Sequence, residues 1–520
     1  MLRRASGVLL GGVAAMAIAG SVSAATFTVT TTADSGPGSL RQALLDANAN
    51  GAATDDLVQF NIPGAGPHVI NVLSNLPAIT SLITIDATSQ PGWSANTNRP
   101  QQGGLNGTLV VELTTTEPIT GTVGLQFNGG TTAGPRIVRG LAISGFEVLI
   151  SNLAASSLTL EGNYLGTDVS GSVVPRSPAV GVALNVVTTS VTIGGLTPAS
   201  RNLLAANAAS SGTGISAQGF VATGSLLVQG NLIGTDRSGS LARPWLNGIG
   251  LVGYVSGGPS SGVQIGGSDV LARNLISGNL QAGVLVTFNT TYSPQGIAIE
   301  GNYIGTDPSG NLPLPNGTNA NLHAGILFLQ GNDVPWRSRV GGTLPGAGNR
   351  IAHNVGGGIR VRNTITLTQP GTLTVLGNQI FDNLGPAFEL QDSARANDLN
   401  DPDNGFNRAQ NWPQILSGAR INGLTLELDF RVDTAIANAT YPLNVEFYRG
   451  TRPEAEGVAP LGSVVITAAQ AQSSLATSFP LGPEPLGFVT AIATDAAGNS
   501  SEFGDPLDVN LVFRNGFETP

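Results

Sequence analysis

The chain consists of short segments in which apolar and polar residues alternate, separated by turns rich in Gly, Asn and Pro. Examples are SLLVQGN at 225–231, GIAIEGN at 296–302 and TLTVLGN at 372–378. Alternation with a period of two is the pattern of a half-buried β-strand. The pattern therefore predicts an all-β protein without long helices.

One phrase follows such strands repeatedly. It reads GNYLGTD at 162–168, GNLIGTD at 230–236 and GNYIGTD at 301–307, with a degenerate GNQIFDN at 377–383. A second phrase, IGG or VGG, recurs at 193–195, 265–267 and 340–342, and each copy is followed by two Asn residues five positions apart. Self-similarity at a long and nearly regular interval indicates a solenoid.

The spacing of Asn suggests a finer period. Asn163, Asn185, Asn207 and Asn231 are separated by 22, 22 and 24 residues, which predicts three coils of about 23 residues in each long repeat. Successive coils would pair as parallel strands. Asn side chains at one corner could then bond to the copies above and below, with the preceding Gly supplying a positive φ.

The Asp of each repeated phrase raises the question of chemistry. Three coils at about 4.8 Å per coil would separate Asp168, Asp236 and Asp307 by about 14 to 15 Å, which is too far for a pair of acid–base carboxylates. An Asp that closes the turn before Ser-Gly is the favoured interpretation. A repeated ligand or Ca²⁺ loop is the alternative.

The segment before the repeats is suited to cover the first coil. A strand is expected at 26–32, followed by a Pro-Gly turn and a short helix in which Ser39 and Gln42 form a capping box. Leu40, Ala43, Leu44 and Ala47 would lie on one face of this helix. An open end of a solenoid exposes unpaired strands and needs such a cover.

From about residue 397 the pattern changes to a polar, turn-rich stretch and then to strands with frequent turn signals, which predicts a β-sandwich of the immunoglobulin or fibronectin kind. The expected fold is a right-handed parallel β-helix (solenoid) with an N-terminal cap helix and a C-terminal β-sandwich domain. The expected divisions are a signal peptide (1–24), strand and cap helix (25–54), β-helix (55–396), acidic linker (397–412), sandwich (413–508) and tail (509–520).

Several motifs together resemble one known group of proteins. ADSGPGSLRQAL at 33–44, VQFNIPGAGPHVI at 58–70 and the GNYIGTD phrases are similar to exported bacterial right-handed parallel β-helix repeat proteins with a Ser-Leu-Arg-Glu-Ala-type N-terminal cap, which have a pectate-lyase-like fold. Gln42 stands where that group often has Glu. The resemblance implies the fold and export, and the group is largely without an assigned activity.

The N-terminal segment and the composition limit the location, the side-chain chemistry and the binding partners that we expect. The first 24 residues combine two arginines, an apolar run and small residues before Ala24, as in a secretory signal peptide. No other stretch is long and apolar enough to span a bilayer. The 520 residues contain no Cys and no Lys, and the net charge is −10 with pI near 4.8, so thiol and lysine chemistry are excluded and nucleic acid is not an expected partner. We expect a protein secreted by, or held on, a Gram-negative bacterium.

Candidate catalytic residues are few. The chain lacks the motif set of polygalacturonases, and its three His residues are scattered. GGGIRVR places Arg360 and Arg362 on one side of a strand, and Asp382 follows Arg360 by 22 residues, about one predicted coil. These residues could hold a uronate or act as the base of a lyase. The alternative is an exposed ion pair between coils.

The stretch DLNDPDNGFN is the candidate metal site. It supplies oxygen ligands of the kind that Ca²⁺ prefers, at Asp398, Asn400, Asp401, Asp403 and Asn407. The distal Glu of an EF-hand is missing, and a solvated acidic linker is the alternative. No other cofactor is indicated.

These observations favour a surface-interaction protein that binds a glycan or a cell surface along the β-helix, or that serves as a rigid extracellular scaffold. The alternative is a polysaccharide lyase or a glycoside hydrolase, and a lyase is the expected class if the chain is an enzyme. The sequence names no ligand and no oligomeric state.

Overall fold

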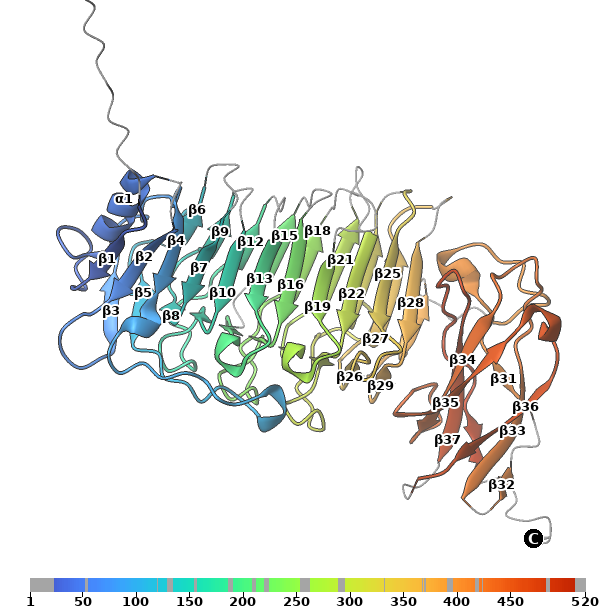
Figure 1. Ribbon diagram of the computed structural model, residues 1–520. Coiled ribbons are helices and arrows are strands. Elements are labelled where there is room, and N and C mark those ends of the chain that lie inside the picture. Colours follow the sequence, from blue (N-terminus) through green and yellow to red (C-terminus); the bar gives the residue numbers. More distant parts are fainter. Residues whose placement is uncertain are drawn as a thin grey trace, which may run out of the picture.

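A computed structural model shows the arrangement of the chain (Figure 1). It describes residues 23–51, 55–118, 120–128, 134–153, 157–185, 190–207, 212–218, 224–252, 262–288, 295–331, 333–366, 368, 371–390, 396–416, 420–422, 424–482 and 487–509. The predicted signal peptide up to residue 22 and the tail from residue 510 lie outside the described residues.

Three long parallel sheets form the coils of a right-handed β-helix, which confirms the predicted fold class. Sheet A contains β1 (Thr26–Val29), β2 (Asp55–Phe60), β4 (Leu82–Asp86), β7 (Arg136–Arg139), β10 (Leu158–Glu161), β13 (Ser190–Gly194), β16 (Ser225–Gln229), β19 (Val263–Gly266), β22 (Gln295–Glu300), β25 (Arg337–Gly341) and β28 (Thr372–Leu376).

Sheet B contains shorter strands: β3 (His68–Asn71), β5 (Val111–Thr114), β8 (Leu141–Ile143), β11 (Tyr164–Leu165), β14 (Leu203–Leu204), β17 (Leu232–Ile233), β20 (Leu275–Ile276), β23 (Tyr303–Ile304), β26 (Arg350–Ala352) and β29 (Gln379–Phe381). Sheet C contains β6 (Val123–Phe127), β9 (Val148–Asn152), β12 (Val180–Leu184), β15 (Thr213–Gln218), β18 (Asn247–Val252), β21 (Ala282–Phe288), β24 (Ala324–Gln330), β27 (Gly357–Asn363) and β30 (Phe388–Leu390).

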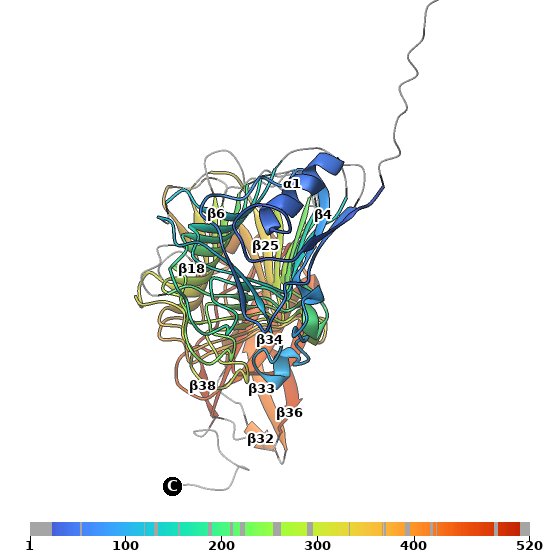
Figure 2. The same ribbon diagram turned by 90° about the vertical axis from the view of Figure 1, so that its left-hand side faces the viewer.

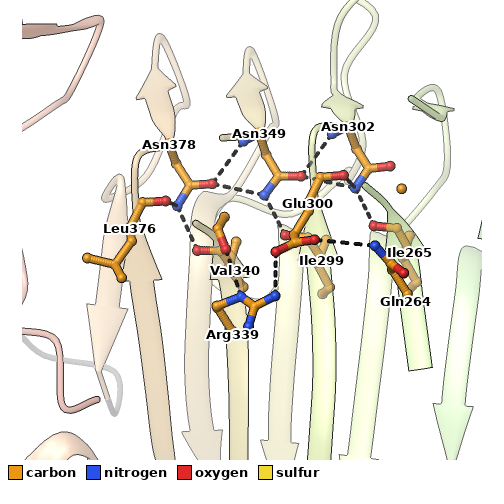
Figure 3. A network of polar contacts seen from close by, with 12 residues as sticks. Gln264, Ile265, Ile299, Glu300, Asn302, Arg339, Val340, Asn349, Leu376 and Asn378 are labelled. Carbon is orange, nitrogen blue, oxygen red and sulfur yellow. Dashed lines mark hydrogen bonds and ion pairs between the residues drawn. The ribbon is translucent and has the colours of Figure 1, made fainter. Parts of the chain in front are cut away.

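A ladder of buried Asn side chains runs along the corner between sheets A and B (Figure 3). Each Nδ2 donates to the Oδ1 of the next Asn at 2.9 to 3.2 Å and to a main-chain carbonyl of the preceding coil. The rungs are Asn163, Asn202, Asn231, Asn274, Asn302, Asn349 and Asn378, and each is at most 2% exposed. The amide stack that the sequence predicted is therefore present.

A second ladder marks the corner between sheets B and C. Its rungs are Asn279, Asn316, Asn354 and Asn383, joined by Nδ2–Oδ1 bonds of 2.9 to 3.0 Å. The paired Asn residues of the IGG repeats thus divide their roles, because Asn274 belongs to the first ladder and Asn279 to the second. The phrase at 301–307 is in this sense a corner of the fold.

The predicted coil of about 23 residues is wrong. Successive rungs of the first ladder lie 28 to 47 residues apart, and each long repeat spans two coils because β13 lies between β10 and β16. Asn185 is exposed at the end of sheet C strand β12 and is not a buried rung. The sequence spacing misled because corner loops of unequal length separate residues that stack directly on one another.

The helix α1 (Leu40–Asn50) covers the first coil (Figure 2). Its four buried residues are the predicted Leu40, Ala43, Leu44 and Ala47, which join the main core. Only half of the capping box is present: Ser39 Oγ accepts from the N–H of Gln42 at 3.2 Å, but the Gln42 side chain donates to Asp46 at 2.8 Å. The N–H of Ser39 instead donates to Gly36 at 3.1 Å, so that Gln42 is not needed there.

Two antiparallel sheets with a common core follow the β-helix. One contains β31 (Gln414–Ile415), β33 (Thr425–Arg431), β32 (Arg420–Asn422) and β36 (Leu475–Pro480), and the other contains β35 (Ala459–Ile466), β34 (Leu443–Gly450), β37 (Phe488–Thr494) and β38 (Leu507–Asp508). We call this unit of two antiparallel sheets the sandwich.

Short 3₁₀ turns occupy Ala87–Ser89, Pro100–Gln102, Pro198–Ser200, Val270–Ala272, Phe406–Ala409 and Ala468–Gln470.

The sandwich caps the last coil with carboxylates. The last strand of each sheet leaves N–H groups without a partner strand, and one Glu accepts from the end of each sheet: Glu446 from Gly377 at 2.9 Å, Glu456 from Asp382 at 3.0 Å and Glu502 from Leu390 at 2.7 Å. Tyr448, Ile492 and Phe503 of the sandwich belong to the main core of the β-helix. The two units therefore form one continuous body (Figure 1).

The Glu446 cap should make stability depend on pH. Burial raises the pKa of Glu446 above its usual 4.5, although its bonds to Gly377 and Tyr448 act in the opposite direction. Between pH 4.5 and the raised pKa, Glu446 holds a proton in the native state that the unfolded chain releases. The stabilisation that protonated Glu446 gives the native state is therefore full below pH 4.5 and is lost as the pH rises through the raised pKa. We expect the urea midpoint of Glu446→Gln, measured relative to wild type, to improve from pH 4 to pH 7. The opposite trend would contradict the burial of this carboxyl.

Among the described residues, no helix has the length and apolar character needed to cross a membrane.

Candidate functional site

The Asp residues of the repeated phrase close their own turns, as predicted. Asp168 Oδ1 accepts from the N–H and the hydroxyl of Ser170, and Asp307 Oδ1 accepts from the Ser309 hydroxyl at 2.6 Å and from the N–H of Leu312 at 3.1 Å. The copies are two coils apart, which corresponds to about 10 Å, so the distance argument against a carboxylate pair does not hold. The turn contacts are what assign these residues to structure.

The arginines around the loops mainly donate hydrogen bonds to main-chain carbonyls. Arg201 donates to Gly230 and Asn98, each at 2.9 Å, and Arg243 donates to Ser172 at 2.9 Å. Burial lowers the pKa of Arg201 to about 10. A guanidinium offers five N–H donors in a fixed fork, which suits it to bond several loop carbonyls at once.

The predicted catalytic residues do not come together. Arg360 in β27 is 4% exposed and pairs with Glu389 of β30, its neighbour in register, with Nε 2.5 Å from Oε2. Arg362 lies on the same side of the strand, as predicted, and donates to the carbonyl of Asn321. Asp382 pairs instead with Arg452 of the sandwich at 3.2 Å. Arg360 therefore has a structural partner, and only Asp382 reaches the site described next.

A cleft of about 740 Å³ lies between the last coil and the sandwich. Its apolar lining includes Phe381, Phe388, Trp412 and Phe503, and Arg452, Glu454, Ala455 and Glu456 line it from the sandwich. Aromatic walls with a few polar groups are typical of small-molecule and sugar sites. We call this space the junction cleft.

Arg452 forms ion pairs with carboxylates on both sides of the junction cleft. Its Nη2 lies 3.2 Å from Asp382 Oδ1 and 2.8 Å from Glu456 Oε2, and its Nε lies 3.8 Å from Glu454 Oε2. Burial acts to raise the pKa of Glu456, but the bonds from Arg452 and from the N–H of Asp382 outweigh it and the pKa is lowered. The hydrogen bond to Glu456 likewise raises the pKa of Arg452. These two groups are therefore charged at neutral pH.

His353 also lines the junction cleft, in a left-handed backbone conformation with φ of 63°. Its ring lies edge-on to Phe381, with centroids 6.0 Å apart. Its Nε2 is buried and has no hydrogen-bond partner among the described residues.

The predicted metal ligands have divided roles. Asn407 is 1% exposed and uses its amide on Leu373 and Ser500, at 2.6 to 2.8 Å. Asn400 Oδ1 accepts from Gln472 at 2.7 Å. Within the part of the chain that the structure describes, no three His, Cys, Asp or Glu side chains are grouped to hold a metal ion. The predicted five-residue set is therefore not assembled. Of the predicted ligands, Asp398, Asp401 and Asp403 are left as individual candidates.

Sequence reasoning missed most of the junction cleft. The signal that it could have used is the alternation of Arg452, Glu454 and Glu456 in TRPEAEG at 451–457, which would place the three on one side of an extended segment. In the structure this segment is a run of bends. Nothing in that pattern indicates that Asp382 completes the group, because the partner comes from another unit of the fold.

No known protein-family model matches the chain, and no curated protein matches it. Among solved structures, the chain is similar to the A-module of a mannuronan C-5 epimerase from Azotobacter vinelandii, at 13% identity and a TM-score of 0.26, over 72% of this chain and 100% of that one. A likeness of this size carries no conclusion about activity.

Proposed function

We propose that this chain is an exported protein that binds an extracellular glycan in the junction cleft and holds it at the end of a rigid β-helix. The observation that carries the proposal is the junction cleft itself, where aromatic side chains lie beside the exposed carboxylates of Asp382 and Glu454. The apolar face of a sugar packs on aromatic rings, and its hydroxyl groups donate to carboxylates.

The charge of the junction cleft favours neutral or amino-bearing glycans over uronates. Its lining contains one arginine, Arg452, and five carboxylates: Asp382, Glu454, Glu456, Glu502 and Asp505. A site lined by one sign of charge repels ligands of the same sign. The uronate clamp expected at Arg360 and Arg362 has no support from their contacts, because both guanidinium groups bond to protein carbonyls.

Location is part of the same proposal. The signal-like segment at 1–24 supports a chain that is released or held outside a Gram-negative cell. The alternative function, a polysaccharide lyase or glycoside hydrolase, would use the same cleft with Asp382 and Glu454 as the acid and base.

The test combines binding and turnover on purified protein. Neutral, amino-bearing and uronate polysaccharides are presented on an array and in solution, with reducing ends and unsaturated-product absorbance followed in parallel. We expect retention of a neutral or amino glycan without turnover, weakened at least tenfold by Glu454→Gln together with Trp412→Ala. Leu153→Ala is the matched control, because Leu153 is exposed, directly follows β9 of sheet C and does not line the junction cleft. Turnover of any substrate, or retention that the cleft variant does not weaken, would overturn the binding proposal.

A further inference from the structure

Two buried carboxylate oxygens in the linker have no hydrogen-bond donor among the residues that the structure describes. They are Oδ1 of Asp398 and Oδ1 of Asp401. Asp401 is 2% exposed, and its other oxygen accepts from Gln410 at 2.8 Å, from the N–H of Asn411 at 3.1 Å and from Thr434 at 2.7 Å. One side of this carboxylate is thus fixed by three donors while the other faces none. A buried oxygen in that position is costly unless something else satisfies it.

Asn411 holds the two acidic residues close together. Its Oδ1 accepts from the N–H of Asp398 at 3.1 Å, its Nδ2 donates to the Asp398 carbonyl at 2.8 Å, and its own N–H donates to Asp401 Oδ2. The Asn411 side chain also donates to the Asp433 carbonyl of the sandwich at 2.7 Å. The pair of carboxylates is therefore anchored at the point where the linker meets the sandwich.

No cation of the protein compensates this charge. Among the described residues, no arginine pairs with Asp398, Asp401 or Asp403, and the neighbouring Arg408 donates to the carbonyl of Asn438 at 3.3 Å. The site is electrostatically suited to accept a positive ion.

We propose that Asp398 and Asp401 are the anionic ligands of a Ca²⁺ ion that fastens the linker to the sandwich. Ca²⁺ takes six to eight oxygen ligands in flexible geometry, so carbonyls and water can complete the shell that two carboxylates begin, whereas Mg²⁺ demands a near-ideal octahedron. Because few protein carboxylates contribute, the affinity should fall in the range of about 10⁻⁴ to 10⁻³ M that is typical of extracellular modules.

This site is smaller than the one expected from sequence. Asn400 and Asn407 are not ligands, because Gln472 and the backbone of the last coil use their side chains. A proton shared between Asp398 and Asp401 is the competing explanation for the two unpartnered oxygens. If the two carboxyl groups share a proton, Ca²⁺ should have no effect. Titration with Ca²⁺ therefore distinguishes a shared proton from a bound ion.

The experiment uses the full mature chain freed of metal by EDTA and dialysis. Calorimetric titration with CaCl₂ measures binding directly, and the thermal midpoint is followed in parallel up to about 10 mM Ca²⁺, ten times the weaker end of the expected range. We expect wild type to bind about one ion and its midpoint to rise, with a smaller effect from equal MgCl₂. Asp398→Asn with Asp401→Asn should abolish both responses while far-ultraviolet circular dichroism stays that of wild type.

The matched control is the other acidic cluster of the junction, altered by Asp382→Asn with Glu454→Gln. This control should keep the full Ca²⁺ response. Absence of binding to wild type, or equal binding to the linker variant, would overturn the proposal. Loss of binding in the control alone would also overturn it, because the ion would then belong to the junction cleft.

Discussion

Replacement of Asn302 by Ala is expected to lower the free energy of unfolding by about 3 to 5 kcal/mol. Asn302 is fully buried and lies between Asn274 and Asn349 in the first ladder, and Figure 3 shows its contact with Asn349. Its Nδ2 donates to Ile265 and Glu300 and to Asn349 at 3.0 Å, and its Oδ1 accepts from Asn274 at 2.9 Å. Each buried polar group that loses its partner costs about 1 to 3 kcal/mol, and the substitution leaves several of them on both neighbouring coils.

Denaturation with urea, followed by circular dichroism, measures this effect. The matched control is Asn321→Ala, because Asn321 is exposed and its side chain has no hydrogen bond among the described residues. A surface substitution of that kind should stay within about 0.5 kcal/mol of wild type. If Asn302→Ala also stayed within that range, the ladder would be a consequence of the coil geometry and not a source of stability.

The ladder shows what the sequence could and could not predict. The residue type followed from chemistry, because a repeated Asn after Gly at the end of a strand suits a stacked corner. The positive φ of the Gly before the rung is present at Gly162, Gly230 and Gly301. The coil length did not follow, because it depends on how far each loop bulges before the chain returns to the corner. Only the pairing of Asn163 with Asn202, and not with Asn185, fixes that length.

The candidate site was less predictable for a related reason. Arg360 and Arg362 were placed on one side of a strand by their spacing alone, which the structure confirms, but the partner of Arg360 is set by a register that puts Glu389 beside it. The junction cleft joins Asp382 of the last coil to Arg452 of the sandwich. Contacts between units that pack end to end leave no periodic signal in a single sequence.

Asn407 illustrates how an oxygen-rich pattern can serve another purpose. Its Oδ1 accepts from the N–H of Leu373 at 2.6 Å, and its Nδ2 donates to the carbonyls of Leu373 at 2.8 Å and Ser500 at 2.7 Å. The side chain therefore pairs with the last strand of sheet A as another strand would, and ties it to the sandwich. Asn is suited to this position because φ is 52°, a conformation that Asn adopts more readily than most residues.

Asn407→Ala is accordingly expected to cost about 3 to 4 kcal/mol, from three lost hydrogen bonds and an unfavourable backbone conformation. Asn407→Gly removes the same bonds but relieves the backbone, so it should recover about 1 kcal/mol of that loss. Both variants should also expose the linker at 396–411 to limited proteolysis, because the end of the last coil loses its tie to the sandwich.

Arg408→Gln is the matched control for this pair. Arg408 is exposed, adjacent and also left-handed, with φ of 55°, but its guanidinium makes one contact of 3.3 Å to Asn438. It should keep the wild-type midpoint and protease resistance. Equal loss in Asn407→Ala and Asn407→Gly would assign the whole effect to the hydrogen bonds. A wild-type result for both would mean that other contacts of the sandwich hold the end of the β-helix without Asn407. Glu446, Glu456 and Glu502 accept from the three sheets, and Ser500 accepts from the N–H of Val375 at 2.8 Å.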